Sequence, residues 1–563
     1  MKHFLNHRDS LVQESLQGLI ATSAGRLTRL DGYPQIKVVV RADWNKERVA
    51  VISGGGSGHE PAHAGFVGPG MLTAAVCGEV FASPSVEAVL TAIRAVAGRA
   101  GVLLVVKNYT GDRLNFGLAA ERARQMGLKV EMVVVGDDVS LAPSVQPRGI
   151  AGTLLVHKVA GYFAEKGEDL ETVTRIAGEV ADSVKSLGLA LTTCHTPGNP
   201  GKERLGDDEA ELGLGIHGEP GVQKVPMAGA REMLARVVEG VQSAVGEGPL
   251  AALFNNLGAV PPVEMGVLVK DYLETPLGER TELMVGPGHL MTSYDMNGFS
   301  LTVLPLTEGV REALTAPVPI PAWPGAVVPK QPRLLPLPSV VGEEPRASRD
   351  PLVAVRLTAI VRRLQESRDD LNALDGKVGD GDAGDTFANA AAAIEARLGA
   401  LPMSDPAELL GALSSSLGHA GGSSGILLAI FTGGASGEYR KSKSWTQALI
   451  YGVERMHFYG GAKPGDRTML DSLWPALQAL KEGKSLVEVA QIARQAADAT
   501  AELTEAGAGR SAYLGAGALA GVVDPGAEAV ARAFEALAEC PTEVSDEEVP
   551  PEESFEMGGS DEE

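Results

Sequence analysis

Two segments of the sequence concentrate side chains that could carry chemistry. In the first, "SGGGSGHEPAHAG" at residues 53–65, His59 and His63 form the pattern H-E-x-x-H, which binds zinc when it lies on a continuous helix. Here glycines precede the pattern and Pro61 stands inside it. Because proline belongs in the first turn of a helix, a helix could begin near Pro61, and His59 would then lie in the loop before it. The segment is therefore not predicted to bind zinc.

The glycines of the same segment raise the alternative of a phosphate-binding loop. A Walker loop requires a Lys-Ser/Thr pair after its last glycine, and a dinucleotide-binding loop requires glycine where Pro61 stands; the sequence has neither. Two interpretations remain. The glycines could form a turn that serves packing alone, or they could form a substrate loop lined by His59. We favour the substrate loop because of its place at the end of a predicted strand.

The second segment, "LNALDGKVGDGDAGDT" at residues 371–386, brings four carboxylates within eleven residues: Asp375, Asp380, Asp382 and Asp385. Like charges so close together repel unless a cation joins them. The fifth and twelfth positions of an EF-hand loop are not matched. We expect carboxylates that share Mg²⁺ with the phosphates of a nucleotide, and the alternative is a solvated acidic loop.

Several short motifs downstream of the aspartates could complete a nucleotide pocket. The segment "GGSSG" (421–425) offers backbone and hydroxyl donors suited to phosphate, and Arg510 could neutralise phosphate charge. The segments "KPGDRTMLD" (463–471), "AGAGRSAYLG" (506–515) and "DPGA" (524–527) have the same character. Together they predict a nucleotide pocket built on helix ends.

Two further residues have a possible chemical role and a plain structural one. His217 lies in "LGLGIHGEPG" and could be either a catalyst or a hydrogen-bonded core histidine. Asp112 ends the segment "KNYTGD" after a predicted strand. It could serve as a general base or as the N-cap of the next helix.

The elements that would position these residues are short apolar runs alternating with helical patterns. The runs at 48–53, 101–106 and 130–138 predict strands of a parallel α/β sheet, and those at 249–254 and 299–306 predict strands of a second α/β lobe. Ligands bind at the carboxyl ends of parallel strands. Residues 54–58, 107–112 and 136–138 should therefore share one edge.

At 563 residues the chain is too long for one core. Nine prolines between 317 and 345 indicate an extended linker, and the sequence pattern after this linker is helical. The last 21 residues hold ten acidic residues and no Lys or Arg. We predict a multidomain protein. Its parts are a first α/β lobe (1–190), a second α/β lobe (191–320), a Pro-rich linker (321–350), an all-α domain (351–542) and a disordered acidic tail (543–563).

Composition limits the partners. A formal charge of -23 argues against nonspecific binding to nucleic acid or to anionic membranes. The three cysteines are too widely spaced for a disulfide framework, and the chain has neither an apolar segment of 18 residues nor the pattern of a signal peptide. We expect a cytoplasmic protein.

Long motifs in both halves resemble the ATP-dependent dihydroxyacetone kinases in their single-chain form. The resemblance rests on "SGGGSGHEPAHAGFVGPGMLTAAVCGEVFASPS", "KNYTGDRLNFGLA", "GLGIHGEPG", "FNNLGA", "LNALDGKVGDGDAG", "GGSSG", "GDRTMLDSLWPAL" and "DPGA". It implies that the two α/β lobes form a ketose-binding domain and that the all-α domain is a nucleotide-binding barrel of eight helices. It also implies a homodimer that acts in glycerol metabolism.

The resemblance assigns roles to individual residues. His217 would hold dihydroxyacetone covalently as a hemiaminal, Asp112 would activate the substrate hydroxyl and His59 would assist it. Gly56, Ser57 and Lys107 would contact the substrate. Asp375, Asp380 and Asp382 would hold two Mg²⁺ ions against ATP. The expected nucleotide-binding residues are Ala383, Gly384, Asp385, Thr386, Ser423, Ser424, Gly460, Thr468, Met469, Arg510, Asp524, Pro525 and Gly526.

Two positions depart from the family pattern. Gly509–Tyr513 reads G-R-S-A-Y where the family has G-R-A-S-Y, and Asp385 replaces a small or hydroxyl residue. The leading function is phosphate transfer from ATP to dihydroxyacetone, with glyceraldehyde as a further expected substrate. The alternatives are a triokinase that also cleaves FAD to a cyclic flavin phosphate, and a fatty-acid-carrying protein.

Overall fold

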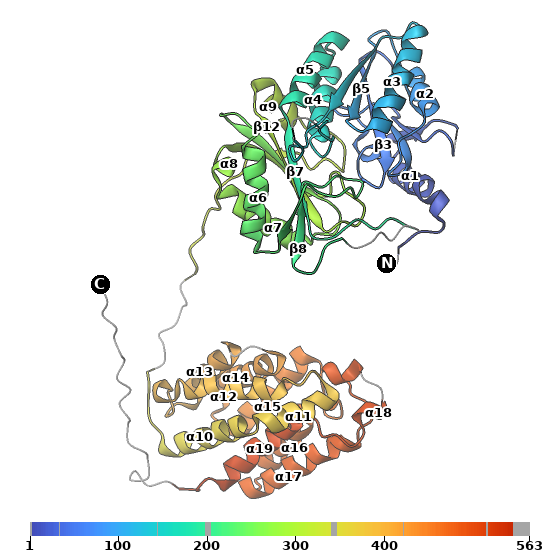
Figure 1. The fold of residues 1–563 in the computed structure, drawn as a ribbon. Coiled ribbons are helices and arrows are strands. Elements are labelled where there is room, and N and C mark those ends of the chain that lie inside the picture. Colours follow the sequence, from blue (N-terminus) through green and yellow to red (C-terminus); the bar gives the residue numbers. More distant parts are fainter. Residues whose placement is uncertain are drawn as a thin grey trace, which may run out of the picture. The chain divides into compact units, whose positions relative to one another are not determined.

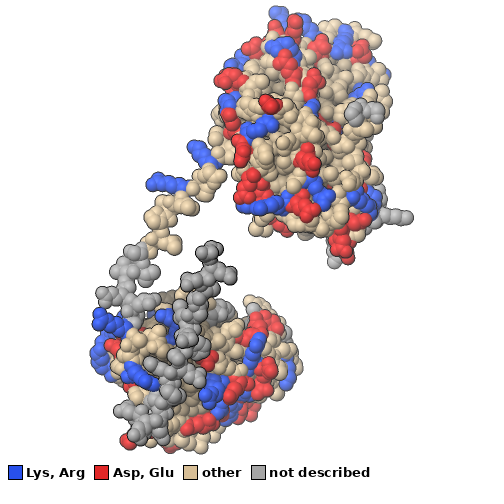
Figure 2. All heavy atoms as spheres, turned by 60° about the vertical axis from the view of Figure 1, so that its left-hand side comes forward, with Lys and Arg blue, Asp and Glu red and all other residues tan. Residues whose placement is uncertain are grey.

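The computed structural model describes residues 3–32, 34–142, 145–197, 204–338, 346–419, 422–513 and 516–543. The chain forms two compact units, Met1–Leu335 and Pro336–Glu563. The first unit combines helices with two β-sheets, and the second is helical (Figure 1). The prediction of an α/β part followed by an all-α part is confirmed. Figure 2 shows acidic and basic side chains interspersed over the visible surface of each unit.

The first sheet has six strands, and its centre is parallel. Their order is β1 (Leu27–Arg29), β2 (Val38–Arg41), β4 (Ala74–Val80), β3 (Ala50–Ser57), β5 (Val102–Lys107) and β6 (Val130–Val135). β3 pairs in parallel with β4 and β5, and β5 with β6, while β1 and β2 add an antiparallel edge. Successive residues of a strand face opposite sides, so Leu103 and Val105 enter one core while Val102 and Leu104 enter another.

The second sheet has seven strands and is mainly antiparallel. Their order is β13 (Ala326–Val327), β11 (Thr281–Gly288), β10 (Leu250–Asn256), β12 (Gly298–Pro305), β7 (Lys185–Ala190), β8 (Glu209–Leu212) and β9 (Gln223–Pro226). Only β10 and β11 pair in parallel. The strands expected at 249–254 and 299–306 are β10 and β12.

Helices cover both faces of each sheet. One core joins the first sheet to α2 and α3, a second lies between the two sheets around α4, α5 and α9, and a third joins the second sheet to α6 and α7. The helices of this unit are α1 (Leu11–Ala21), α2 (Val86–Val96), α3 (Thr110–Gln125), α4 (Thr153–Lys166), α5 (Leu170–Ser183), α6 (Ala230–Gln242), α7 (Pro262–Leu273), α8 (Pro276–Glu279) and α9 (Glu308–Thr315), with 3-10 turns η1 (Arg8–Ser10) and η2 (Ala64–Phe66).

Two boundaries differ from those expected from the sequence. β7 begins at Lys185 and belongs to the second sheet, so that sheet starts before residue 190. Residues 320–327 pack on the first unit, because Ile320 and Trp323 are buried and β13 pairs with β11. The acidic residues from 544 onward lie outside the described residues.

In the second unit, eight long helices form a closed ring within the described residues. In ring order they are α10 (Pro351–Glu366), α12 (Ala383–Glu395), α13 (Pro406–His419), α14 (Gly422–Ser442), α15 (Trp445–Gly460), α16 (Met469–Lys481), α17 (Leu486–Ala499) and α19 (Pro525–Glu539), and α19 returns to α10. The shorter elements are α11 (Arg368–Val378), α18 (Ala516–Leu519), η3 (Leu398–Ala400), η4 (Thr500–Glu502) and η5 (Arg510–Tyr513). This ring is the expected helical barrel. None of the described helices combines the length and the apolar character needed to cross a membrane.

Candidate active site

The carboxyl end of β3 forms the floor of the first candidate site. Gly55 has a φ of +149°, and a β-carbon placed on it would lie 2.7 Å from Lys107 Nζ and 3.3 Å from Asp112 Oδ2. A side chain at this position would therefore occupy the space that Lys107 and Asp112 use. Lys107 ends the neighbouring parallel strand β5, and Asp112 lies in the first turn of α3. Strand order thus brings Gly55 close to Lys107 and Asp112, which lie 52 and 57 residues further along the chain.

Asp112 lies inside the first turn of α3 and is not its N-cap. The N-cap of α3 is Tyr109, and Asp112 lies three residues further on. Its side chain is 2% exposed, and its Oδ1 has no hydrogen-bond partner among the described residues. A buried carboxylate oxygen without a donor is costly, so this oxygen is ready to accept a hydrogen bond from a hydroxyl group.

His59 and His217 come from different halves of the first unit and meet edge to face, with ring centroids 4.8 Å apart. Phe81 stacks on His59, and the rings of Phe81 and Tyr109 contact His217 edge to face at 5.4 and 4.4 Å. His59 follows β3, and His217 lies in the loop between β8 and β9. The pairing of these two histidines is a tertiary contact between the two sheets.

His59 is held as a neutral acceptor. Its Nδ1 lies 2.8 Å from the carbonyl oxygen of Thr292, which can only accept, so Nδ1 carries the proton. Burial lowers the pKa of His59 well below its usual range, and electrostatic interactions with the neighbouring His217 and Lys107 lower it further. Its Nε2 is buried without a partner in the described part of the chain. Like Asp112 Oδ1, this nitrogen can accept a hydrogen bond from a bound ligand.

Glu219 orients His217. One carboxylate oxygen of Glu219 lies 3.2 Å from His217 Nδ1, and the other accepts the backbone N–H of His217 at 2.9 Å. Burial would raise the pKa of Glu219, but its hydrogen bonds to the side chain and backbone of His217, together with electrostatic attraction to that ring, lower it to about 2. An ionised carboxylate only accepts, so Nδ1 carries the proton and Nε2 keeps the lone pair that a nucleophile needs. The His217 side chain is 17% exposed.

Other residues of the opening motif have different surroundings. Ser57, expected to contact substrate, uses its hydroxyl to donate to the carbonyl oxygen of Gly78 at 2.9 Å. A β-carbon on Gly56 would meet the backbone of Phe81 and Ala82 at 2.8–2.9 Å, so this position packs tightly. His63 precedes the turn η2; its ring makes a hydrogen bond to Lys107 and an edge contact with His157. The two histidines of H-E-x-x-H do not converge, in agreement with the rejection of a zinc site.

The second candidate site is a cavity of about 770 Å³ in the helical unit. Of the residues expected to bind metal or nucleotide, it is lined by Asp375, Asp380, Asp382, Ala383, Thr386, Ser423, Ser424, Gly460, Thr468, Met469, Asp524, Pro525 and Gly526. They come from the ends of α11, α12, α14, α15, α16 and α19. The sequence prediction of a pocket built on helix ends agrees with this arrangement.

Three aspartates form the one group of acidic, histidine or cysteine side chains among the described residues whose geometry suits a metal ion. One ligand atom each from Asp375, Asp380 and Asp382 lies within 4.8 Å of the others. Asp375 Oδ2 also accepts the backbone N–H groups of Gly381, Asp382 and Ala383 at 2.9–3.2 Å, which shapes the loop before α12. Carboxylate oxygens are the donors that Mg²⁺ prefers.

Three of the residues expected to bind nucleotide are not seen to line the cavity. Asp385 instead pairs with Arg368 at 2.5 Å, and its backbone N–H donates to Asn372 Oδ1. It is therefore not a fourth carboxylate of the metal group, because the start of α12 turns it toward α11. A β-carbon on Gly384 would collide with the carbonyl oxygen of Arg368, so Gly384 serves packing. Arg510 begins η5, but its side chain lies outside the described residues. The displaced Ser511 does line the cavity.

Comparison with known proteins identifies the family. A Dak1 domain model matches residues 17–322 and a DAK2 domain model matches residues 377–539. The chain is 47% identical to the dihydroxyacetone kinase of Citrobacter freundii over 549 residues, which cover 95% of this chain and 99% of that one. It belongs to the dihydroxyacetone kinase family. The crystal structure of the C. freundii enzyme in its native form matches with a TM-score of 0.82 at 46% identity, covering 96% of this chain and 99% of that one.

The chain is also similar to a family member whose name adds a second activity, and to a solved structure with a bound nucleotide analogue. The chain is 40% identical to human triokinase/FMN cyclase over 577 residues, covering 96% of this chain and 98% of that one. A second structure match, with a TM-score of 0.81 at 45% identity, is the C. freundii dihydroxyacetone kinase in complex with AMP-PNP and Mg²⁺; it covers 96% of this chain and 99% of that one.

Two residues that the structure places at the candidate sites were not predicted from the sequence. Glu219 stands two residues after His217 in "IHGEPG", and this short spacing could have suggested a contact between the two residues. Arg467 lines the nucleotide cavity, is 1% exposed and donates to the carbonyl oxygen of Val522 at 2.6 Å. Its Nε and Nη1 have no partner among the described residues. Buried guanidinium donors facing a cavity suit an anionic or acceptor-rich ligand.

Proposed function

We propose that this protein transfers the γ-phosphate of ATP to dihydroxyacetone. The observation that carries the proposal is the pair of buried acceptors without donors, His59 Nε2 and Asp112 Oδ1, in the same site as a histidine held with its lone pair on Nε2. Dihydroxyacetone offers two hydroxyl donors and one carbonyl carbon. The hydroxyl groups can donate to the two acceptors, and the carbonyl carbon can react with the lone pair of the histidine.

The ketose is tethered to His217. The Nε2 lone pair adds to the carbonyl carbon as the carbon–oxygen π bond breaks, and the carbonyl oxygen takes a proton from solvent water, to which the His217 side chain is 17% exposed, and becomes a hydroxyl group. The addition places positive charge on the ring, and Glu219 faces the Nδ1–H that carries it. Glycerol has no carbonyl carbon, so it cannot be tethered and is rejected as a substrate.

The tether fixes one terminal hydroxyl group for attack on the γ-phosphate. Asp112 accepts the proton of this hydroxyl as the oxygen–phosphorus bond forms, and ADP leaves with the electrons of the bond that breaks. Lys107 Nζ and Asp112 Oδ2 border the same space above Gly55.

ATP is bound in the helical unit. Asp375, Asp380 and Asp382 would hold Mg²⁺, since three carboxylates whose ligand atoms lie within 4.8 Å match its preferred oxygen donors. Bound there, Mg²⁺ would neutralise charge on the phosphate oxygens. Ser423 and Ser424 lie in the first turn of α14, where backbone N–H groups and the helix dipole favour phosphate.

The test is an ADP-release assay with dihydroxyacetone, glyceraldehyde and glycerol, in the presence and absence of Mg²⁺. We expect turnover of the first two substrates and none of glycerol. Turnover of glycerol at a rate similar to that of dihydroxyacetone would reject the tether, and no ADP release with any of the three would reject the kinase assignment.

A second candidate activity is cleavage of FAD to a cyclic flavin phosphate. The likeness to human triokinase/FMN cyclase over nearly the full chain favours testing it. Incubation with FAD and Mn²⁺ should be followed by chromatography of the flavin products; a cyclic product would add this activity, and unchanged FAD would exclude it.

We also propose a cytoplasmic homodimer that acts in glycerol metabolism. The family resemblance supports this assignment, and the three cysteines are unpaired, as expected in a reducing compartment. Light scattering coupled to size-exclusion chromatography would measure the mass; a single species of one chain's mass, 58.4 kDa, would contradict the dimer.

A further inference from the structure

His63 makes the closest contact to the buried ammonium group of Lys107. The distance from Lys107 Nζ to His63 Nε2 is 2.6 Å, and the Lys107 and His63 residues are 0% and 4% exposed. The other acceptor, the carbonyl oxygen of Gly54, lies at 3.5 Å, the outer limit of a hydrogen bond. Within the described residues no carboxylate lies within 4.0 Å of Lys107 Nζ. His63 is therefore its principal partner.

The charges around this contact decide which group holds the proton. Lys107 is faced by Asp112 from α3, Asp137 after β6 and Cys77 from β4; His63 is faced by His59 and by His157 from α4. Burial lowers the pKa of Lys107, and the two aspartates raise it. Burial, followed by the charge of Lys107, holds the pKa of His63 well below its usual range. His63 is the neutral acceptor, and Lys107 is the charged donor.

We propose that His63 is a positioning residue of the phosphate transfer: by accepting a hydrogen bond from Lys107, it keeps that ammonium group charged and beside Asp112. This inference rests on the proposed function. It gives a role to the second histidine of the H-E-x-x-H motif, which contacts neither His217 nor the aspartates of the helical unit in the described contacts.

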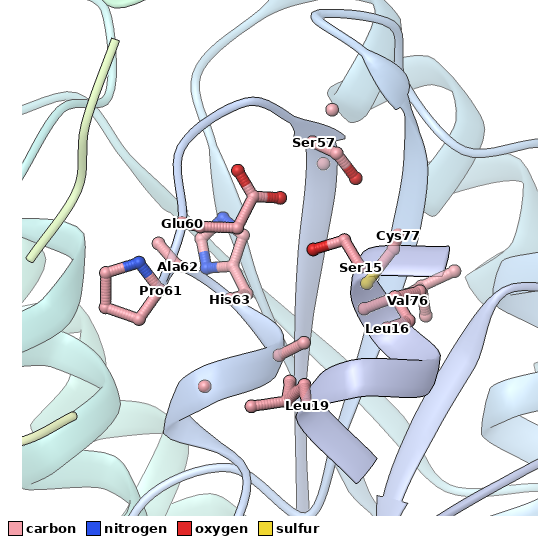
Figure 3. A pocket seen from close by; sticks show the side chains of 14 residues that line it. Ser15, Leu16, Leu19, Ser57, Glu60, Pro61, Ala62, His63, Val76 and Cys77 are labelled. Carbon is pink, nitrogen blue, oxygen red and sulfur yellow. The ribbon is translucent and has the colours of Figure 1, made fainter. Parts of the chain in front are cut away.

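His63 lines a cavity whose lining does not include the predicted catalytic residues, and small solutes can reach it from this cavity. Figure 3 shows a cavity between α1 and the end of β3, with His63, Glu60, Ser15 and Cys77 around it. Its volume is about 380 Å³, and its lining does not include His59, Asp112 or His217. Shortening His63 would therefore open a space continuous with this cavity, large enough for a small aromatic base.

The first experiment replaces His63 by Leu and by Gln. In His63→Leu the ammonium group loses its acceptor, so the pKa of Lys107 falls and the charged form is lost at lower pH. In a plot of kcat against pH, the basic limb should shift to lower pH by about one to two units. This shift corresponds to the free energy of a hydrogen bond to a charged group. At neutral pH kcat should fall about tenfold or more, with a smaller change in the KM for ATP. His63→Gln, whose amide oxygen can accept, should restore much of the wild-type profile.

The matched control is His157→Leu. His157 is a fully buried histidine of the same cluster, with its ring 5.2 Å from that of His63. It makes no hydrogen bond to Lys107 among the described contacts, and both its nitrogens are without a partner there. We expect its pH profile to match the wild type. A shift in His157→Leu equal to that in His63→Leu would mean that packing alone is responsible and would overturn the proposal.

A second variant, His63→Ala, tests the same contact by chemical rescue. Imidazole should enter through the cavity, accept the Lys107 hydrogen bond and restore activity, whereas pyrrole, a ring of similar size whose nitrogen can donate but not accept, should restore less. Equal effects of the two compounds, or none from imidazole, would reject the role of His63. Absence of activity in the wild-type protein would instead reject the proposed function, so the two failures are distinguishable.

Discussion

The ketose site and the nucleotide site satisfy their polar groups in opposite ways. In the first, His59 and Lys107 are buried and the His217 side chain is 17% exposed, and each is paired with another protein group: His59 with Thr292, His217 with Glu219 and Lys107 with His63. In the second, Asp380 and Asp382 are exposed around an open cavity, and the group of carboxylates has a net negative charge. The first site thus holds its histidines and its lysine by hydrogen bonds within the protein, whereas the second requires a cation.

The difference follows from the ligands. A small neutral ketose supplies hydroxyl groups and a carbonyl carbon, so it is bound by desolvated hydrogen bonds and by a nucleophile in a fixed tautomer. A nucleotide supplies several negative charges, which acidic residues can bind only through a metal ion. One protein thus uses buried hydrogen bonds to set the tautomers of its histidines in one unit and leaves a group of carboxylates open to a metal ion in the other.

The largest effect is expected at the nucleotide site, in Asp375→Asn. This change removes one of the three metal ligands and weakens the acceptor of three backbone N–H groups, so kcat should fall by roughly 10³-fold or more. Titration of activity with Mg²⁺ should show a raised half-saturation concentration. Asp385→Asn is the control, since Asp385 pairs with Arg368 outside the metal group, and it should change kcat less than threefold. Equal losses in the two variants would contradict the assignment of the metal group.

A smaller loss is expected at the ketose site, in His217→Ala. Without the tether the ketose is held by hydrogen bonds alone, so kcat/KM for dihydroxyacetone should fall by roughly 10²-fold or more. The KM for ATP should stay within about twofold of the wild type. Mass spectrometry of the intact protein after reduction of the bound ketose should lose the adduct in the variant; a persisting adduct would move the tether to another residue.

The two sites were not equally predictable from the sequence. The aspartates of the metal group lie within eight residues, so their convergence could be predicted from local spacing and the shape of a glycine-rich loop. The parallel strands β3 and β5 and their functional edge were also predicted from apolar runs and strand–helix alternation. The contact between His59 and His217 joins residues 158 apart through two sheets, and spacing alone contained no sign of it; the family resemblance suggested it.

Errors arose where a neighbour in space overrode the local pattern. Asp385 looked like a fourth carboxylate, but Arg368 on α11 draws it away. Asp112 could have been a helix cap, but the helix begins two residues before it, at Thr110. Arg467 was missed because its importance depends on burial beside a cavity, which a single charged residue between Asp466 and Thr468 does not indicate.

The next prediction concerns stability at the nucleotide site, where one carboxylate is buried in contrast to Asp380 and Asp382. Burial raises the pKa of Asp524 to about 7, and its Oδ2 caps α19 by accepting the N–H of Ala527 at 2.8 Å. The folded state therefore retains a proton that the unfolded state has lost, and stability falls as pH rises from about 4 through 7. Asp524→Asn keeps the cap and removes this loss of about 2 kcal/mol between pH 5 and 7. Urea unfolding followed by circular dichroism should show a flatter pH dependence in the variant; an unchanged dependence would assign it to other groups.

The smallest effect is expected in Glu219→Gln at the ketose site. The amide oxygen of Gln can still accept from His217 Nδ1, so the tautomer is kept, but the negative charge that faces the ring during addition is lost. A hydrogen bond to a charged group is worth about 1 kcal/mol more than one between neutral groups, so kcat/KM should fall about fivefold. The measurement is kcat/KM for dihydroxyacetone against pH, with Glu219→Leu alongside. Leu removes the acceptor as well, so its loss should exceed that of Gln and approach that of His217→Ala. If Gln and Leu were equally impaired, the charge of Glu219 would account for its whole effect, and the ketose site would depend on electrostatics as much as the nucleotide site does.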